Sequence, residues 1–237
     1  MRPARKPIFC YVTDGRSLEA AHAVSDSLPS NSASSLRVRL LCDSIRRAAA
    51  AGIDWIQIRE KDLDTRLLAE LARFAIGETR VTSTKILIND RLDVALAAGA
   101  TGVHLGEQSL PLERVNEWRR SGGRLDFQIG VSCHSLDDAR AAERGRADYI
   151  FFGPVFATPS KEAFGRPQGI ECLQEVCSAI EIPVLAIGGV NVENARACIE
   201  AGAAGIAAIR LFQDVRNSEE LAPVLEKLKA RAPGGGH

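Results

Sequence analysis

Short apolar runs alternate along the chain with longer segments in which apolar residues recur at helical spacing. The short runs predict β-strands, and the longer segments predict amphipathic helices. Because strands and helices alternate strictly, the pattern favours parallel β/α units. The predicted strands are Ile8–Thr13, Ile53–Ile58, Lys85–Ile88, Gly102–His104, Phe127–Gly130, Tyr149–Phe152, Pro183–Ile187 and Gly205–Ile209. The predicted helices are Val38–Ala51, Thr65–Ile76, Leu92–Ala98, Leu112–Arg120, Leu136–Arg144, Gly169–Ala179, Val192–Ala201 and Ser218–Ala230.

Three similar phrases, Ala98–Val103, Arg144–Tyr149 and Ala201–Ile206, each end a helix and enter the next strand. The glycine in each phrase suits a left-handed helix C-cap. Repetition of one unit in a chain of 237 residues predicts a single-domain (β/α)8 TIM barrel, a fold that typically needs about 250 residues. An open doubly wound sheet is the alternative, because the third and fourth strands are short and partly polar.

Two segments depart from this plan. Ser25–Ser35 is Ser-rich with few apolar residues, so it predicts a flexible loop after the first strand. The glycine-rich residues 232–237 predict a frayed tail. The apolar run after the basic start, Ile8–Thr13, is too short for the core of a signal peptide. No run approaches the ~18 apolar residues of a membrane span.

Charge is balanced, with 30 basic and 30 acidic residues. Without a broad basic field, neither a nucleic acid nor a membrane is expected as a partner, and anions must be bound by a few focused groups. The six cysteines form no CxxC pair and no zinc spacing, so they predict reduced core thiols. We therefore expect a cytoplasmic protein that binds small phosphorylated molecules. The oligomeric state is left open, a homo-oligomer included.

The residues that follow each strand are the candidates for function, because β/α barrels place their sites at the carboxyl ends of the strands. After the second strand, alternation puts Gln57, Arg59 and Lys61 on one side of the chain. An amide and two cations facing the barrel axis suit a diphosphate. A solvated, self-paired charge run is the alternative interpretation.

The third and fourth strands lead into oxygen donors. Asn89 and Asp90 end the third strand, and a carboxylate beside an amide suits Mg²⁺ bound together with substrate phosphates. Asn89 is also a plausible cap for the helix that follows. Ser109 lies in the polar loop after the fourth strand, whereas His104 within that strand is typical of a hydrogen-bonded core histidine.

Beyond the fifth strand, Ser132 and His134 share one face, and His134 is a candidate acid or base at neutral pH. No partner acid or nucleophile lies nearby in the sequence, so this role stays open. Ser135 and Asp138 resemble a helix capping box.

The last three strand ends add hydroxyls, glycines and cations. The connection after the sixth strand is the longest, and such loops often close over phosphates. Paired glycines that open a helix let backbone N–H groups approach a phosphate, and the loops after strands seven and eight form the usual barrel phosphate site. The residues concerned are Thr158, Ser160, Lys161, Gly188, Gly189, Ile209 and Arg210.

Together these residues resemble the thiamine-phosphate synthase family and its thiazole tautomerase relatives. The matching motifs run in family order over nearly the whole chain: Tyr11-Val12-Thr13-Asp14, Gln57-Ile58-Arg59-Glu60-Lys61, Asn89-Asp90-Arg91, Gly102-Val103-His104-Leu105-Gly106, Gly130-Val131-Ser132, Asp148-Tyr149, Gly153-Pro154-Val155-Phe156, Lys161 and Ala186-Ile187-Gly188-Gly189.

The resemblance implies a transferase that joins a hydroxymethylpyrimidine diphosphate to hydroxyethylthiazole phosphate, with release of pyrophosphate and thiamine phosphate. It implies Mg²⁺ as the cofactor, with Asp90 and Ser109 at the metal positions. The residues implied for the pyrimidine diphosphate are Gln57, Arg59, Glu60, Lys61, Asn89, Ser132 and Lys161. Those implied for the thiazole phosphate are Thr158, Ser160, Gly188, Gly189, Ile209 and Arg210. The implied catalytic residues are Arg59, Lys61, Lys161 and His134.

Two positions depart from the family pattern. Ser109 stands where the family usually has a second metal-binding aspartate, which should weaken the metal site. Arg210 stands where the family usually has serine after the last strand, and its guanidinium can still bind phosphate. Two alternative functions therefore stay open. One is a metal-independent thiazole tautomerase with His134 as the acid or base, and the other is a non-catalytic binder of thiamine precursors.

Overall fold

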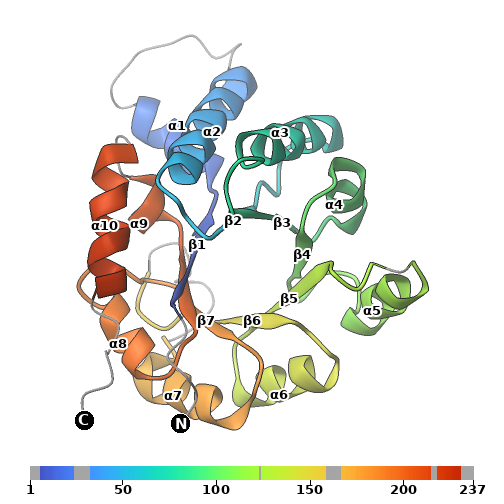
Figure 1. Cartoon of the computed structure of the whole chain (residues 1–237), viewed down its shortest axis with the longest axis vertical. Helices are drawn as coiled ribbons and strands as arrows, with labels where there is room; N and C mark the ends of the chain where they lie inside the picture. The colour runs from blue at the N-terminus through green and yellow to red at the C-terminus, as the bar shows by residue number, and fades with distance from the viewer. Residues whose placement is uncertain (1–5, 24–32, 123, 159–166, 215–217, 231–237) are drawn as a thin grey trace.

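The computed structural model describes residues 6–23, 33–122, 124–158, 167–214 and 218–230. Its strands form one closed parallel barrel in the order β1-β2-β3-β4-β5-β6-β7-β8, and the helices lie outside the ring of strands (Figure 1). The first and last strands pair directly, with Ile8 opposite Gly205 and Tyr11 opposite Ala208. This pairing confirms the TIM barrel and excludes the open sheet.

The strands are β1 Ile8–Val12, β2 Trp55–Ile58, β3 Lys85–Asn89, β4 Gly102–Leu105, β5 Gln128–Cys133, β6 Tyr149–Phe152, β7 Val184–Ile187 and β8 Gly205–Ala208. The helices are α1 Gly15–Ala23, α2 Ala33–Ala50, α3 Thr65–Glu78, α4 Leu92–Ala98, α5 Leu112–Ser121, α6 Leu136–Arg144, α7 Gly169–Ala179, α8 Ala195–Glu200, α9 Arg210–Gln213 and α10 Ser218–Ala230. None of the described helices is long and apolar enough to cross a membrane.

The region after β1 differs from the prediction. Helix α1 was not expected, and α2 begins at Ala33, so the last three residues of the predicted Ser-rich loop are helical. Helix α2 is held by Leu41 and Ile45, both fully buried in the core. Packing of that face stabilises a helix that then extends toward its N-terminus through residues without apolar periodicity. The rest of the predicted loop, and the predicted tail at 232–237, lie outside the described residues.

The repeated helix-to-strand phrases adopt two different backbone conformations. Gly99 and Gly202 have φ values of 77° and 99°, which confirms the predicted left-handed caps. In the phrase after α6, however, Arg146 takes the positive φ (63°) and Gly145 does not. A Cβ at position 145 would lie 2.6 Å from Cδ2 of Leu112. The glycine there provides room for close packing, so its predicted cap role was wrong.

Aromatic side chains fill the barrel interior at the amino ends of the strands. Trp55 and Tyr149, the first residues of β2 and β6, pack edge to face with ring centroids 4.8 Å apart. Tyr149 lies over Gly130 of β5, where a Cβ would come within 2.0 Å of the ring atom Cζ. Because first strand residues lie at the amino end of a parallel barrel, this layer closes that end and leaves the interior open at the carboxyl ends of the strands.

Candidate active site

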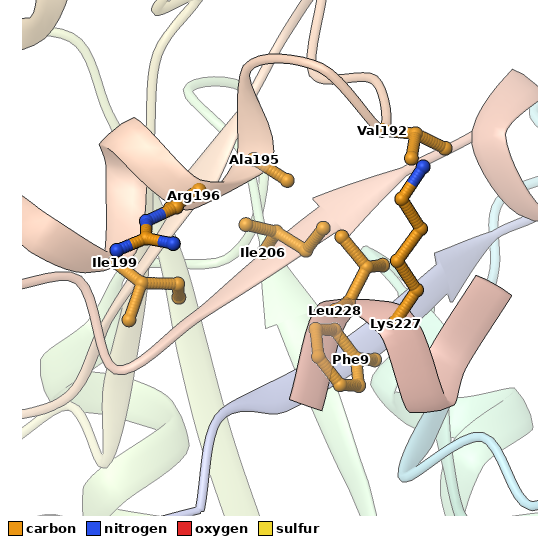
Figure 2. A pocket seen from close by; sticks show the side chains of 8 residues that line it. All are labelled: Phe9, Val192, Ala195, Arg196, Ile199, Ile206, Lys227 and Leu228. Carbon is orange, nitrogen blue, oxygen red and sulfur yellow. The ribbon is translucent and has the colours of Figure 1, made fainter. Parts of the chain in front are cut away.

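A cavity of about 1010 Å³ opens at the carboxyl ends of the strands, large enough for small-molecule substrates. By contrast, a crevice on the outside of the barrel, between β1, β8, α8 and α10, has a volume of about 10 Å³ (Figure 2), room for no more than a water molecule. Most predicted site residues in the described part of the chain line the large cavity: Gln57, Arg59, Lys61, Asn89, Asp90, Ser132, His134, Thr158, Gly188, Gly189, Ile209 and Arg210.

The end of β2 brings two cations to this cavity. Gln57 is buried and its Nε2 donates to Oδ1 of Asn89 over 3.0 Å, while Arg59 and Lys61 line the cavity above it. Neither cation forms an ion pair with any other described residue. The self-paired interpretation of this segment is therefore wrong for Arg59 and Lys61, and both are available to an anion.

Glu60 is the predicted substrate-binding residue that does not line the cavity. Its side chain points away from it and accepts hydrogen bonds from Thr13 Oγ1 (2.7 Å) and from the backbone N–H of Gly15 (3.1 Å). Burial raises the pKa of the Glu60 carboxyl above its ordinary value. The reason lies in the alternation of the chain, which turns position 60 outward when positions 59 and 61 face inward.

Asp90 forms the centre of a group of oxygen atoms at the ends of β3 and β4. It adopts a left-handed backbone conformation (φ 61°), and its Oδ1 accepts from the N–H of Gly106 (3.2 Å) and from the Ser109 hydroxyl. Its Oδ2 accepts from Asn89 Nδ2 (2.6 Å). Asn89 is thus engaged with Asp90 and Gln57, and its predicted cap role was wrong, since Arg91 occupies the N-cap of α4.

The chemistry of these donors fits Mg²⁺ bound in part by substrate. Mg²⁺ takes hard oxygen ligands, and proteins commonly hold it with one or two carboxylates plus substrate phosphates. Asp90 offers one carboxylate, Ser109 a hydroxyl, and the exposed Glu107 a second carboxylate on the same loop. No group of three or more histidine, cysteine, aspartate or glutamate side chains that could hold a metal occurs among the described residues. Such a site would need substrate oxygens to complete its coordination.

Ser132 is connected to the barrel floor through His104. The histidine is fully buried, with Nε2 2.9 Å from Ser132 Oγ and Nδ1 3.2 Å from the Tyr149 hydroxyl. This confirms His104 as a hydrogen-bonded core histidine, although its ring also contributes to the cavity wall. The arrangement places the Ser132 hydroxyl at the cavity floor in a defined orientation.

His134 lies higher on the same side, at the start of the loop after β5. Its Nδ1 contacts the carbonyl oxygen of Gly153, and its Nε2 lies 3.8 Å from Oε1 of Glu107. Half of the predicted capping box is present, since the Asp138 N–H donates to Ser135 Oγ (3.1 Å) at the N-cap of α6. The Asp138 carboxylate accepts instead from the N–H of His134 (3.1 Å), the residue before the N-cap. The structure therefore supplies Glu107 as the acidic neighbour that the local sequence lacks.

The ends of β7 and β8 contribute glycines and a cation to the same cavity. Gly188 and Gly189 have φ values of 92° and 66°, and a Cβ at either position would come within 2.6 Å of Pro154 or 2.5 Å of the Ala157 carbonyl oxygen. Only glycine permits this close approach of the two loops. Arg210 begins α9 at the same edge, and its Nη2 donates to Thr158 Oγ1 over 3.3 Å. Ser160 and Lys161 lie outside the described residues.

Several cavity residues were not assigned a role from the sequence, namely Asp14, Ser17, Phe151, Asn191 and Asp214. Asp14 directly follows the first strand, so the strand-end rule could have found it. Asp214 reaches the cavity only through the unpredicted helix α9. Burial raises the pKa of its carboxyl, and Arg210 opposes that effect.

Comparisons with known proteins agree with this geometry. A family model described as thiamine monophosphate synthase matches residues 31–212. The chain belongs to the thiamine monophosphate synthase family. It is 40% identical over 190 residues to a thiamine-phosphate synthase of Moorella thermoacetica, a match that covers 80% of this chain and 89% of that protein. It is 36% identical over 222 residues to a thiamine-phosphate synthase of Chlorobium luteolum, covering 94% and 92%.

A solved structure supports the same family. The thiamine phosphate pyrophosphorylase from Pyrococcus furiosus superposes with a TM-score of 0.74 at 32% sequence identity, covering 94% of this chain and 97% of that one. This family member is thus an enzyme of thiamine phosphate synthesis. Its barrel matches that of a family relative over nearly the full length.

Proposed function

We propose that this enzyme condenses a hydroxymethylpyrimidine diphosphate with hydroxyethylthiazole phosphate in the large cavity. The observation that carries the proposal is that two sets of residues suited to anions, each a candidate pocket, line one cavity. Arg59 and Lys61 face it from β2, and Gly188, Gly189 and Arg210 face it from β7 and β8. One pocket suits a diphosphate and the other a monophosphate.

The reaction breaks the bond between the pyrimidine methylene carbon and the diphosphate oxygen. The electron pair leaves with the diphosphate, so negative charge develops next to Arg59 and Lys61 while the methylene carbon becomes cationic. Cations fixed where charge develops stabilise the transition state. The thiazole nitrogen then donates its electron pair to the methylene carbon, forming the new C–N bond and a thiazolium ion.

Proton transfer is not needed in this bond exchange, because the thiazolium nitrogen carries no hydrogen to lose. His134 is therefore expected to contribute through contacts, and its replacement by alanine should leave substantial activity. In a tautomerase the same residue would carry the proton and its replacement would abolish turnover. His134 thus distinguishes the two reactions.

We propose Mg²⁺ as the cofactor, held by Asp90 with Ser109 beside it. When bound, Mg²⁺ would neutralise the charge of the departing diphosphate. Asp90 carries the only carboxylate that lies directly at the end of β3 in the described cavity wall. We also propose that the enzyme acts in the cytoplasm, a reducing compartment that suits its six free cysteines.

The test is an assay of pyrophosphate release with both substrates and Mg²⁺, together with detection of thiamine phosphate. We expect release that requires both substrates and is lost in EDTA and in Asp90→Ala. Asp93→Ala is the matched control, since Asp93 is an exposed carboxylate on α4 paired with Arg91 and outside the cavity. It should retain activity.

Other outcomes would contradict the proposal. No release above background at high enzyme concentration would exclude the condensation. Isomerisation of a thiazole carboxylate phosphate that survives EDTA and fails in His134→Ala would identify a tautomerase. Affinity for thiamine phosphate without turnover in either assay would identify a binding protein.

A further inference from the structure

Glu60 is a buried carboxylate immediately between the two cavity cations. We infer that Glu60 is a positioning residue: it fastens the end of β2 to the end of β1, so that Arg59 and Lys61 are held facing the diphosphate pocket. This inference rests on the proposed function only in taking the diphosphate as the ligand of these cations.

Four hydrogen-bond contacts join the two strand ends. Glu60 Oε1 accepts from Thr13 Oγ1 (2.7 Å), and both Glu60 oxygens accept from the Gly15 N–H (3.1 Å each). The Thr13 hydroxyl oxygen in turn accepts from the backbone N–H of Arg59 (2.9 Å). The Glu60 carboxylate therefore orients the Thr13 hydroxyl, and that hydroxyl holds the backbone of Arg59 in place.

Burial of the Glu60 carboxylate destabilises the folded protein unless its hydrogen bonds compensate for the lost hydration. Its side chain is only 5% exposed, and it forms no ion pair with the described residues. A buried carboxylate is destabilising unless hydrogen bonds compensate, and replacement of such groups by well-packed neutral ones is often tolerated. Its donors are Thr13, which follows β1, and Gly15, which begins α1, so its hydrogen bonds all stabilise the junction between β2 and the segment after β1.

Side chains of residues 57–62 alternate between two faces of the chain. Gln57, Arg59 and Lys61 face the cavity, whereas Glu60 and Asp62 point toward α1 and α2. Asp62 pairs with Arg37 and Arg16 near the surface. Arg16 is exposed and Arg37 is partly buried, and neither contacts the backbone of Arg59, whereas Glu60 acts on it through Thr13.

Gly15 shows how tightly the carboxylate is enclosed. A Cβ at position 15 would lie 2.8 Å from Glu60 Oε2 and 2.8 Å from Arg37 Cγ. Gly15→Ala should therefore displace the carboxylate without changing any charge or touching the cavity wall. It provides an independent way to disturb the same junction.

The experiment compares Glu60→Gln and Gly15→Ala with two matched controls. Asp62→Asn removes the same charge from the exposed position two residues on, and Gly77→Ala adds the same methyl within α3, where nothing lies within 4 Å. Each variant is measured for KM of each substrate, for the Kd of inorganic pyrophosphate by calorimetry in Mg²⁺ buffer, and for Tm.

We expect both test variants to raise the KM for the pyrimidine diphosphate and the Kd for pyrophosphate by about tenfold, equivalent to ~1.4 kcal/mol. The KM for the thiazole phosphate and all constants of the controls should stay within about twofold, since exposed substitutions have small effects. A purely structural role would lower Tm and the active fraction but leave the pyrophosphate Kd unchanged, and that result in both variants would overturn the inference.

The wild-type protein separates this inference from the proposed function. If it binds pyrophosphate but makes no thiamine phosphate, the condensation is wrong while a weakened pyrophosphate Kd in Glu60→Gln still supports the positioning role. If the wild type has no affinity for pyrophosphate, the positioning role for a diphosphate pocket is overturned as well.

Discussion

The imidazole Nε2 of His104 lies 2.9 Å from the hydroxyl oxygen of Ser132. On the other side of the ring, Nδ1 faces the Tyr149 hydroxyl, which has no other hydrogen-bond partner in the described part of the chain. In the tautomer in which the tyrosine donates to Nδ1, Nε2–H donates to Ser132, and the Ser132 proton is then left for the cavity. Bonding across the barrel thus sets the direction of a hydroxyl in the active site.

Tyr149→Phe should remove the hydrogen bond that orients His104 and, through it, the Ser132 hydroxyl, while leaving the ring packing intact. We expect kcat/KM for the pyrimidine diphosphate to fall by about two- to tenfold, as loss of a hydrogen bond worth 0.5–1.5 kcal/mol predicts. Tyr11→Phe is the control, because it removes an equally buried hydroxyl bonded to Ser44 and Gln213, away from Ser132. Equal losses of kcat/KM in the two variants would argue against the relay.

Ser109→Asp should restore a second carboxylate beside Asp90. Ser109 now donates a hydrogen bond to Asp90, so the substitution replaces attraction by repulsion between like charges. We expect a lower Tm than wild type in EDTA and a larger Tm increase on adding Mg²⁺, because tighter binding to the folded state raises its stability. Ser109→Asn, of similar size and without charge, should show no such gain. Equal Mg²⁺ responses of the two variants would exclude Ser109 from the metal site.

Burial of Glu60 predicts a pH dependence of folding. The pKa of this carboxyl is raised above the ordinary value of 4.5, first by burial, and Asp14 and Asp62 add to the effect while Thr13 and Gly15 oppose it. A raised pKa means that the folded state binds the proton more tightly than the unfolded chain. This stabilising contribution is therefore present below pH 4.5 and is lost as the pH rises through the folded pKa.

Denaturant unfolding of wild type and Glu60→Gln from acidic to neutral pH measures this effect. The free energy of unfolding of wild type should fall relative to the variant as the pH rises. Asp93→Asn is the control with the opposite sign, since Arg91 lowers the pKa of Asp93. Its slope should be small because the pair is exposed. A pH-independent difference between wild type and Glu60→Gln would contradict the prediction.

The buried thiols should be unreactive in the folded protein. Cys10, Cys133 and Cys198 are fully buried, and burial raises the pKa of Cys133 and of Cys198 to about 12. Because the thiolate is the reacting species, iodoacetamide at pH 8 should leave these three unmodified, as read by peptide mass spectrometry. All six should react after unfolding. Rapid labelling of Cys133 in the native protein would show that β5 opens locally.

Much of the barrel follows from local patterns. Strand ends were predicted to within a few residues because alternating β/α periodicity is a property of neighbouring positions, as the agreement at Tyr149–Phe152 and Leu92–Ala98 shows. The strand-end rule also identified Arg59, Asp90, Ser132 and Arg210, since a parallel barrel gathers the carboxyl ends of all strands on one face.

Contacts between distant segments decided the rest. The sequence alone determined many of the residues that line the cavity mouth. Closure, however, needed the pairing of β1 with β8, and the burial of Glu60 needed donors from Thr13 and Gly15. Helix α1 and the start of α2 likewise form where local periodicity is weak. Hydrogen bonding and burial across long sequence separations set these features, because their free energies depend on partners that appear only after the chain has closed.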